Sequence, residues 1–309
     1  YESLGSELRL LILCDFIKKE MLSMVGNAST VPCELGAVPI FEYIRRKGMQ
    51  GVRLGVLSGS VVIVPSDVCE ALTPLFEKYM CEGSLTPLGD TGYSKVILKG
   101  SGHHIVSMIT ELFTCGQINV LVGTKSLLGE GWDSPCINSL ILATYVGSFM
   151  LSNQMRGRAI RVFKDQPDKT SNIWHLACVF PTGLESSGEL SGDYETLKRR
   201  FDAFLGVSAL DGVIESGIER LGLEKNLNSR KNIEKCNQRT MKIAGDRKGL
   251  RETWENDLKV IYGDMRVEEV EEVDKGLLEP GYLFLNAVVM EIISVILFIL
   301  SILSRTIGS

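Results

Sequence analysis

The side chains best suited to chemistry gather in one short stretch, residues 154–161, QMRGRAIR. It carries Arg156, Arg158 and Arg161 on a segment that we expect to be helical. Arg158 and Arg161 stand three positions apart, a spacing that places both side chains on one helix face. The rigid donor fork of arginine suits phosphate oxygens, and the charge that develops on a transferring phosphoryl group, better than lysine does. Taken alone, the same spacing is more typical of a solvated basic helix face.

A second stretch with chemical potential lies upstream, at residues 119–135, NVLVGTKSLLGEGWDSP. It predicts a strand, a Gly-Thr pair at the carboxyl end of that strand, and a polar turn that contains Gly129, Gly131 and Asp133. Ligands of open parallel sheets bind beyond the carboxyl ends of the strands. Glycine there lets the backbone approach a phosphate, and a carboxylate can accept from a ribose hydroxyl or hold an arginine. An ordinary strand-to-helix turn explains the stretch equally well when it is taken alone.

The elements that must position these residues alternate between short apolar runs and amphipathic segments. We expect strands at residues 8–15, 52–57, 61–64, 95–99, 119–122, 140–144 and 173–180. We expect helices at residues 38–47, 67–79, 105–113 and 152–160, and loops at residues 26–36 and 85–92. This alternation predicts an α/β fold with a parallel sheet covered by helices on both faces. After Pro181 the pattern changes, and residues 195–205 and 214–273 predict charged helices without strands.

The two chemical stretches occur together, in this order, about 20 residues apart and separated by a strand. That constellation resembles motifs V and VI of superfamily 2 helicases of the DEAD/DEAH type, whose motif VI has the form QxxGRxxR. The upstream order is similar too, with strand LLILCD as motif IV, helix IFEYIRRKG, strand VRLGVLSG, helix MITELFTCG and strand NVLVGT. The resemblance covers about residues 8–180. It implies the second, C-terminal RecA-like domain of such a motor.

The resemblance implies a role for each matching residue. Arg158 and Arg161 would act as arginine fingers on the γ-phosphate of ATP bound to an N-terminal RecA-like domain of the same protein. Gln154 would sit beside the same nucleotide. Gly131 and Asp133 would line the cleft between the two domains.

A further pair of residues would face the nucleic acid, DNA or RNA. By resemblance, Thr124 would touch its backbone, with Lys125 beside it. Two departures from the family pattern stand out. Met155 occupies a position where many members have arginine, so one contact to the nucleotide or partner domain is in doubt. Residues 60–103 form an insertion between a strand and the following helix.

The sequence supplies only part of the machinery for ATP hydrolysis, which needs a phosphate cradle, a magnesium ligand, a positioned water and charge stabilisation. It contains no GxxxxGK[ST] loop and no DExx box. We therefore expect ATP and Mg²⁺ to be bound mainly by the first domain, and this chain alone to be inactive. The intact protein is expected to be an ATP-dependent helicase or translocase. The alternative is a non-catalytic, degenerate motor-domain module used for docking or membrane tethering.

Other candidate residues carry weaker signals. His103 and His104 open a predicted helix, where exposed cap residues are more common than catalytic ones. His175 lies in a predicted central strand and is expected to be a hydrogen-bonded core residue. Trp132 either stacks on a base or the adenine, or packs against its own domain.

Composition bounds these interpretations. The 309 residues carry a net charge of −5, which gives a nucleic-acid function no support. A local basic groove is still compatible with this charge. Eight cysteines are dispersed without a CxxC pair, which argues against a zinc site and favours reduced thiols in the cytoplasm. The first residue, Tyr1, suggests a piece of a longer protein.

The end of the chain is different in character. Residues 282–303 form an apolar segment whose only charge is Glu291. As a helix it would reach about 33 Å, enough to cross a bilayer core. The alternatives are a transmembrane helix that anchors the protein and a buried hydrophobic helix. We expect domains at residues 1–181, 182–276 and 277–309.

Overall fold

The computed structural model describes residues 2–99, 103–124, 132–144, 149–179, 191–202, 205–208, 213–223, 227, 229–264 and 291. Contacts divide the chain into two units, residues 1–259 and residues 260–309. The sheet, the helices packed on it and the candidate site all belong to the first unit. The predicted domain boundaries at residues 182 and 276 stay predictions.

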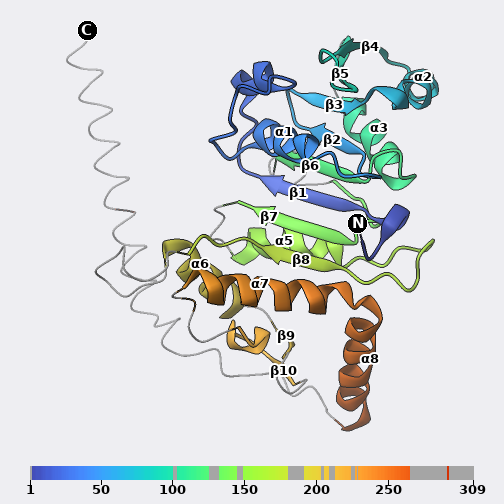
Figure 1. Cartoon of the computed structure of the whole chain (residues 1–309). Coiled ribbons are helices and arrows are strands. Elements are labelled where there is room, and N and C mark those ends of the chain that lie inside the picture. The colour runs from blue at the N-terminus through green and yellow to red at the C-terminus, as the bar shows by residue number, and fades with distance from the viewer. Residues whose placement is uncertain are drawn as a thin grey trace. The chain divides into compact units, whose positions relative to one another are not determined.

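The described residues form one large sheet with the strand order β4-β5-β3-β2-β6-β1-β7-β8 (Figure 1). Its strands are β1 (Leu10–Cys14), β2 (Leu54–Leu57), β3 (Val62–Pro65), β4 (Glu82–Pro87), β5 (Tyr93–Lys99), β6 (Val120–Thr124), β7 (Ser139–Ala143) and β8 (Asn172–His175). Strands β2, β6, β1, β7 and β8 run parallel, as predicted. Strands β3, β5 and β4 add to this sheet antiparallel, so the prediction of a wholly parallel sheet was wrong.

A tight turn between β2 and β3 explains the change of direction. The Ser58 N–H and hydroxyl both donate to the Val61 carbonyl, at 3.0 and 2.8 Å. A turn this short joins only antiparallel strands, because a parallel pair needs a long crossover. Residues 60–103, which we predicted to be an insertion, therefore widen the sheet with β3, β4 and β5.

The second error concerns residues 85–92, where a loop was expected. Part of it is β4, which pairs with β5 from Glu82 opposite Lys99 to Pro87 opposite Ser94. The turn-forming residues that suggested a loop belong to the connection between the two strands, where Gly89 and Gly92 adopt positive φ angles of 55° and 76°. Glycine adopts such angles without strain.

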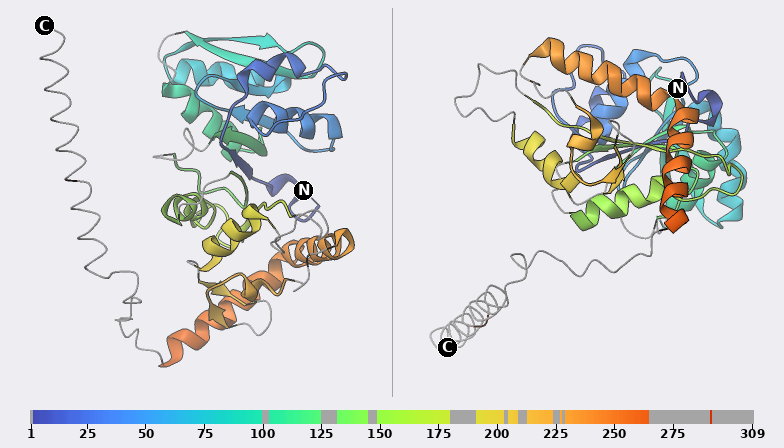
Figure 2. Two further views of the ribbon diagram at one scale, coloured as in Figure 1. Left: turned by 90° about the vertical axis from the view of Figure 1, so that its left-hand side faces the viewer. Right: turned by 90° about the horizontal axis from the view of Figure 1, so that it is seen from below.

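Helices cover both faces of the sheet (Figure 2). Helix α1 (Ala37–Lys47) lies on one face, and α2 (Cys69–Lys78), α3 (His103–Thr114) and α5 (Phe149–Ala159) lie on the other. Strand β1 shows why both faces are covered, since Leu11 and Leu13 join the core under α3 while Ile12 and Cys14 join the core under α1. All four are buried, as expected for a strand between two helical layers.

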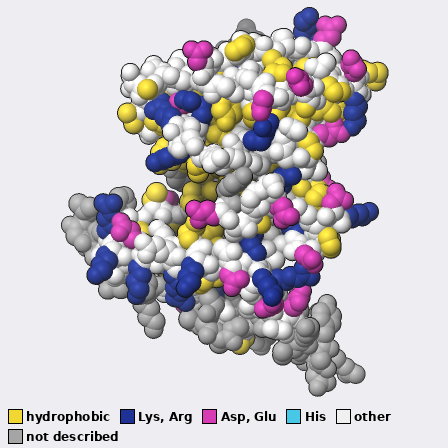
Figure 3. Space-filling view, turned by 45° about the vertical axis from the view of Figure 1, so that its right-hand side comes forward, with side chains coloured by type: hydrophobic (Ala, Val, Ile, Leu, Met, Phe, Trp, Pro, Cys, Tyr) yellow, Lys and Arg dark blue, Asp and Glu magenta, His cyan; other side chains and the backbone are white. Residues whose placement is uncertain are grey.

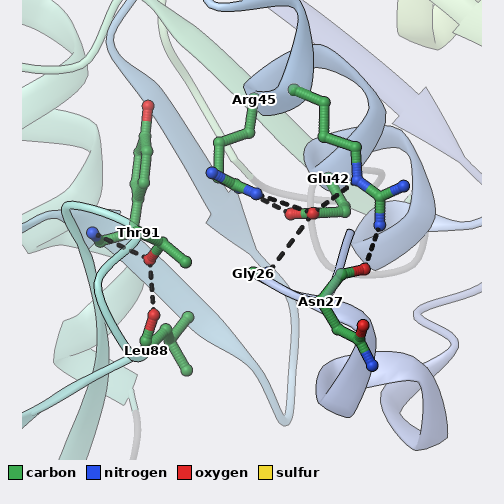
Figure 4. A network of polar contacts seen from close by, with 8 residues as sticks. Gly26, Asn27, Glu42, Arg45, Leu88 and Thr91 are labelled. Atoms are coloured by element: carbon green, nitrogen blue, oxygen red, sulfur yellow. Dashed lines mark hydrogen bonds and ion pairs between the residues drawn. The ribbon is translucent and has the colours of Figure 1, made fainter. Parts of the chain in front are cut away.

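A buried carboxylate anchors α1 to the loop that follows β1 (Figure 4). Glu42 is fully buried and accepts from Arg45 Nε at 2.7 Å, from Arg46 Nε at 2.8 Å and from the Gly26 N–H at 3.3 Å. Burial alone would raise the pKa of Glu42, but the hydrogen bonds from both arginines outweigh it and the pKa is lowered. Arg46 also donates to the Asn27 carbonyl at 2.9 Å, so the loop and the helix end are held as one piece.

Beyond the sheet lie α6 (Gly192–Asp202), β9 (Gly206–Val207), β10 (Ile214–Glu215), the 3-10 turn η4 (Glu219–Leu221), α7 (Arg230–Gly245) and α8 (Arg247–Asp264). The prediction that this region contains no strand was wrong, because β9 and β10 pair antiparallel. Glycines interrupt the expected helix, with Gly217 and Gly222 at φ angles of 92° and 58°.

Helices α7 and α8 are fastened directly to the edge of the sheet. Asn172 Nδ2, on β8, donates to the Ala244 carbonyl at the end of α7 at 2.8 Å. Arg247 Nη1, at the start of α8, donates to the Asn138 and Thr170 carbonyls at 3.1 Å each. The helical region thus covers the β8 edge of the sheet.

The predicted hydrophobic terminal helix at residues 282–303 lies outside the described residues, apart from Glu291. Among the residues that the structure describes, no helix combines the length and the apolar character that a membrane crossing requires.

Candidate functional site

The structure brings the two chemical stretches into contact. Arg158, on α5, donates from Nη1 to the backbone carbonyl of Trp132. Arg161, just beyond α5, forms an ion pair with Asp133. Residues on either side of β7 therefore share one polar cluster, which we call the arginine cluster: Trp132, Asp133, Arg158 and Arg161.

The two arginines of this cluster occupy different environments. Arg158 is 5% exposed, whereas the side chain of Arg161 is 46% exposed. Helix α5 ends at Ala159, so Arg161 stands outside it and the prediction that both arginines project from one helix face was wrong.

The end of α5 is held by side chains of the segment that follows it. The Ala159 carbonyl accepts from the Ser171 hydroxyl at 2.6 Å and from Lys169 Nζ at 3.0 Å. Carbonyls of a last helical turn have no partner within the helix, and side chains that satisfy them fix where the helix stops. Lys169 Nζ also donates to the Pro135 and Ile137 carbonyls, at 2.7 and 2.8 Å. It thereby ties the segment after Asp133 to the end of α5.

Electrostatics separate the two arginines further. Burial lowers the pKa of Arg158, the neighbouring Arg161 cation lowers it again, and the Asp133 carboxylate opposes both effects. A negatively charged group that approached this surface would meet Arg161 first, since Arg158 is buried against the Trp132 carbonyl.

The remaining predicted residues are placed as follows. Thr124 is buried at the carboxyl end of β6, in register with Cys14 of β1. Gln154 is exposed on α5. Met155 is fully buried in the core, where it packs among apolar side chains. Lys125, Gly129 and Gly131 lie outside the described residues.

Trp132, His104 and His175 have defined surroundings in the structure. Trp132 is buried and its indole N–H donates to the Thr110 hydroxyl at 2.7 Å, so it packs within its own domain. His104 is exposed and lies 5.7 Å from the Tyr79 ring. His175 lies on β8, which is the edge strand of the sheet, so its expected place in a central strand was wrong.

Two features of this surface were not predicted. Ile160 and Val162 flank Arg161 and are both exposed. Next to Asp133, a groove of about 1380 Å³ runs along α2 and α3 to Phe163, Asp165 and Gln166. The exposed pair could have been predicted from the sequence AIRVF, in which Ile160 and Val162 alternate with the charged Arg161 at the end of the predicted helix.

The charge on the rest of the surface is mixed. On the face shown in Figure 3, lysine and arginine side chains are interspersed with aspartate and glutamate side chains. Within the described part of the chain, no group of three or more histidine, cysteine, aspartate or glutamate residues could hold a metal ion. All eight cysteines are free thiols.

No family model and no curated protein matches this chain. Among solved structures it is similar to the C-terminal part of the Fun30 ATPase domain, with 13% identity, 55% of this chain and 35% of that chain covered, and a TM-score of 0.30. It is also similar to the Hef helicase domain of Pyrococcus furiosus, with 15% identity, 62% and 24% covered, and a TM-score of 0.29. The chain therefore spans about a third and about a quarter of those two structures. Likenesses this low in identity and TM-score carry no argument, so function has to be argued from the residues themselves.

The arginine cluster has a definite chemical capacity. It presents one accessible guanidinium, held by an exposed carboxylate, in front of a second guanidinium held by a carbonyl. Such an arrangement can donate to oxyanions and stabilise negative charge. The described residues of the cluster provide no nucleophile and no general base pair.

Proposed function

We propose that this chain is the second motor domain of an ATP-dependent nucleic-acid helicase or translocase. Its arginine cluster would complete a site for ATP bound on an N-terminal RecA-like domain of the same protein. The observation that supports this proposal is the contact between the two motif-like stretches, through Arg158 with Trp132 and Arg161 with Asp133. A solvated basic helix face, the simpler interpretation, does not account for a buried arginine bound to the other stretch.

Arg161 is the side chain that meets the γ-phosphate first. Its ion pair with Asp133 is exposed at both ends, and exposed pairs contribute only about 0–1 kcal/mol. A phosphoryl group can therefore take over the guanidinium at little cost. Asp133 keeps the side chain extended at the surface until then, which reduces the entropy lost when the phosphate binds.

Arg158 couples the nucleotide to the rest of the domain. Because it holds the Trp132 carbonyl, a shift of Arg158 toward a phosphate moves the segment that follows β6. That segment connects to Thr124 and Lys125, which the resemblance assigns to the backbone of DNA or RNA. Gln154, exposed on α5, lies beside the nucleotide in this arrangement.

The surface around Arg161 supports closure onto another domain. Ile160 and Val162 are exposed apolar residues on either side of the charge, a pattern typical of surfaces that are covered in an assembly. ATP and Mg²⁺ would be held mainly by the first domain. The described residues of this chain offer Mg²⁺ no cluster of ligands.

The test is the nucleic-acid-stimulated ATPase rate of the full-length protein. Arg161→Ala should lower kcat by about 1000-fold, the scale of a lost arginine finger. Arg199→Ala, which removes an exposed arginine from α6, serves as the matched control and should stay at the wild-type rate. Arg158→Ala is measured with its melting temperature, because Arg158 is buried.

Wild-type rates in both Arg158→Ala and Arg161→Ala would refute the finger assignment. A full-length protein without any ATPase activity would instead support the alternative of a docking module. In that alternative, residues 282–303 would tether it to a membrane.

A further inference from the structure

A second cavity lies on the other side of α5, at the edge of the sheet. It has a volume of about 550 Å³ and is bounded by β8, the end of α5, α6, β9, η4 and α8. These elements gather around the β8 edge (Figure 1). Arg156 lines this cavity, whereas Arg158 and Arg161 belong to the arginine cluster. The motif-like stretch therefore serves two separate places.

The most unusual group in the cavity wall is Arg220. It is 7% exposed, and its Nε has no hydrogen-bond partner among the described residues. Its guanidinium carbon lies 5.0 Å from the centre of the Phe201 ring. On the other side, a Cβ at Gly206 would come within 2.7 Å of the same carbon, so glycine leaves the space that the guanidinium fills. The Arg220 guanidinium thus lies near the Phe201 ring and close to the Gly206 backbone, with a buried Nε donor left over.

Buried polar groups normally find a partner, and a buried cation without one is costly. Such a group indicates a site that a ligand completes. The Arg220 guanidinium is a planar fork, and its geometry matches the oxygens of phosphate and carboxylate groups.

Neighbouring cations make the cavity attractive to anions. Burial lowers the pKa of Arg156 to about 10, and the Arg220 cation contributes to the shift. Burial lowers the pKa of His175 to about 3, and the cations of Arg156, Arg200 and Arg220 lower it as well. His175 is therefore neutral here and adds no charge of its own to the cavity.

Carboxylates also lie around the cavity. Glu215 acts on Arg220, and Asp193 and Asp15 act on Arg200. Asp168 and Glu255 form ion pairs with Arg251 at the rim. Arg156 and Arg220 both line the cavity, together with Arg251.

The outer wall of the cavity is apolar. Trp254 on α8 is partly exposed there, with Leu250 one turn before it and Leu205 opposite on the lining. A cavity of this volume, with an apolar wall and a few polar anchors, is typical of small-molecule sites. The exposed indole of Trp254 in the lining suits a planar ring system.

We propose that this cavity binds a small phosphorylated molecule with a planar portion, such as a nucleoside monophosphate. The phosphate lies between Arg156 and Arg220, and the planar portion packs against Trp254. This site goes beyond the proposed motor function and does not depend on it.

The experiment is a titration of the chain with AMP and with inorganic phosphate, by calorimetry and by thermal melting, at an ionic strength held constant with chloride. Both probes should bind and raise the melting temperature, AMP more tightly than phosphate. Arg220→Gln should weaken both at least tenfold. Arg199→Gln, on α6 but exposed, is the charge-matched control and should bind as the wild type does.

Two further variants keep the test decisive if Arg220→Gln fails to fold. Arg220→Lys retains the charge but not the fork, and should weaken phosphate binding. Trp254→Ala should reduce AMP binding to the level of phosphate. The proposal is overturned if neither probe stabilises the wild type beyond the chloride control. It is also overturned if an oligonucleotide binds in an Arg220-dependent way while AMP and phosphate do not.

Discussion

Lys169 ties together the two segments that carry the arginine cluster. Its ammonium group donates to three backbone carbonyls, of Pro135, Ile137 and Ala159, at 2.7, 2.8 and 3.0 Å. Lys169→Met keeps the length and the apolar stem but removes every one of these donors. The change therefore tests the polar contacts rather than the packing.

The magnitude follows from opposing contributions. A hydrogen bond from a charged donor contributes about 1.5–3 kcal/mol, so three of them set a large upper bound. Burial of the ammonium opposes this, because it lowers the pKa of Lys169 from 10.5 to about 8. The cost of desolvating the ammonium group therefore offsets part of the free energy of these hydrogen bonds. The contributions of bonds that share one donor are also not additive. We expect Lys169→Met to destabilise the first unit by about 2–4 kcal/mol.

The assay is equilibrium urea unfolding followed by circular dichroism, at pH 7, with the slope of the transition checked for constancy. Lys164→Met, an exposed lysine in the same connection, is the control and should stay within about 0.5 kcal/mol of the wild type. If Lys169→Met were also within that range, the three contacts would not hold the end of α5. In the full-length protein, Lys169→Met should lower the ATPase activity, as Arg161→Ala does. The reason is that it releases the carbonyl of Ala159, which lies two positions before Arg161.

Two further predictions concern carboxylates. Glu42→Gln should cost about 2 kcal/mol at pH 7, because it removes the charge from buried hydrogen bonds. Since the folded pKa of Glu42 is lowered, its contribution to stability is present above about pH 4.5 and is lost as the pH falls through the folded value. The free energy of unfolding in urea, measured from pH 6 to pH 3, should therefore decline less steeply in the variant than in the wild type. Equal slopes would contradict this. Asp133→Asn should change the melting temperature little, because its pair with Arg161 is exposed, but it should lower the ATPase kcat of the full-length protein about tenfold through lost positioning. An unchanged kcat beside an inactive Arg161→Ala would separate Asp133 from the site.

The parts of the fold that the sequence predicted are those in which local pattern and burial agree. Strand β1 is an unbroken apolar run, and it lies between two helical layers as such runs do. Helix α1 was expected at residues 38–47 because its apolar spacing ends in basic residues and Gly48, and the helix ends there with Gly48 at a positive φ of 59°.

The errors arose where distant residues decide the structure. The sequence of β4, EGSLTP, has little apolar alternation, and its strand conformation comes from pairing with β5 along its whole length. Helix α5 ends one residue before the predicted end at residue 160, but its start at Phe149 and the contacts of its last carbonyl with Lys169 and Ser171 were not predicted. The cavity around Arg220 joins β8, α6 and α8, and only the folded chain brings these together.

The difference in burial between the two arginines bears on how the proposed motor would work. Releasing Arg161 from Asp133 costs at most about 1 kcal/mol, since water takes over both charges. Releasing Arg158 leaves the Trp132 carbonyl without its donor in a buried place, which costs about 1–3 kcal/mol. Under the proposed function, ATP would therefore recruit Arg161 first and Arg158 only when the first domain closes fully. Closure would then be linked to movement of the segment after β6, because Arg158 holds the Trp132 carbonyl of that segment.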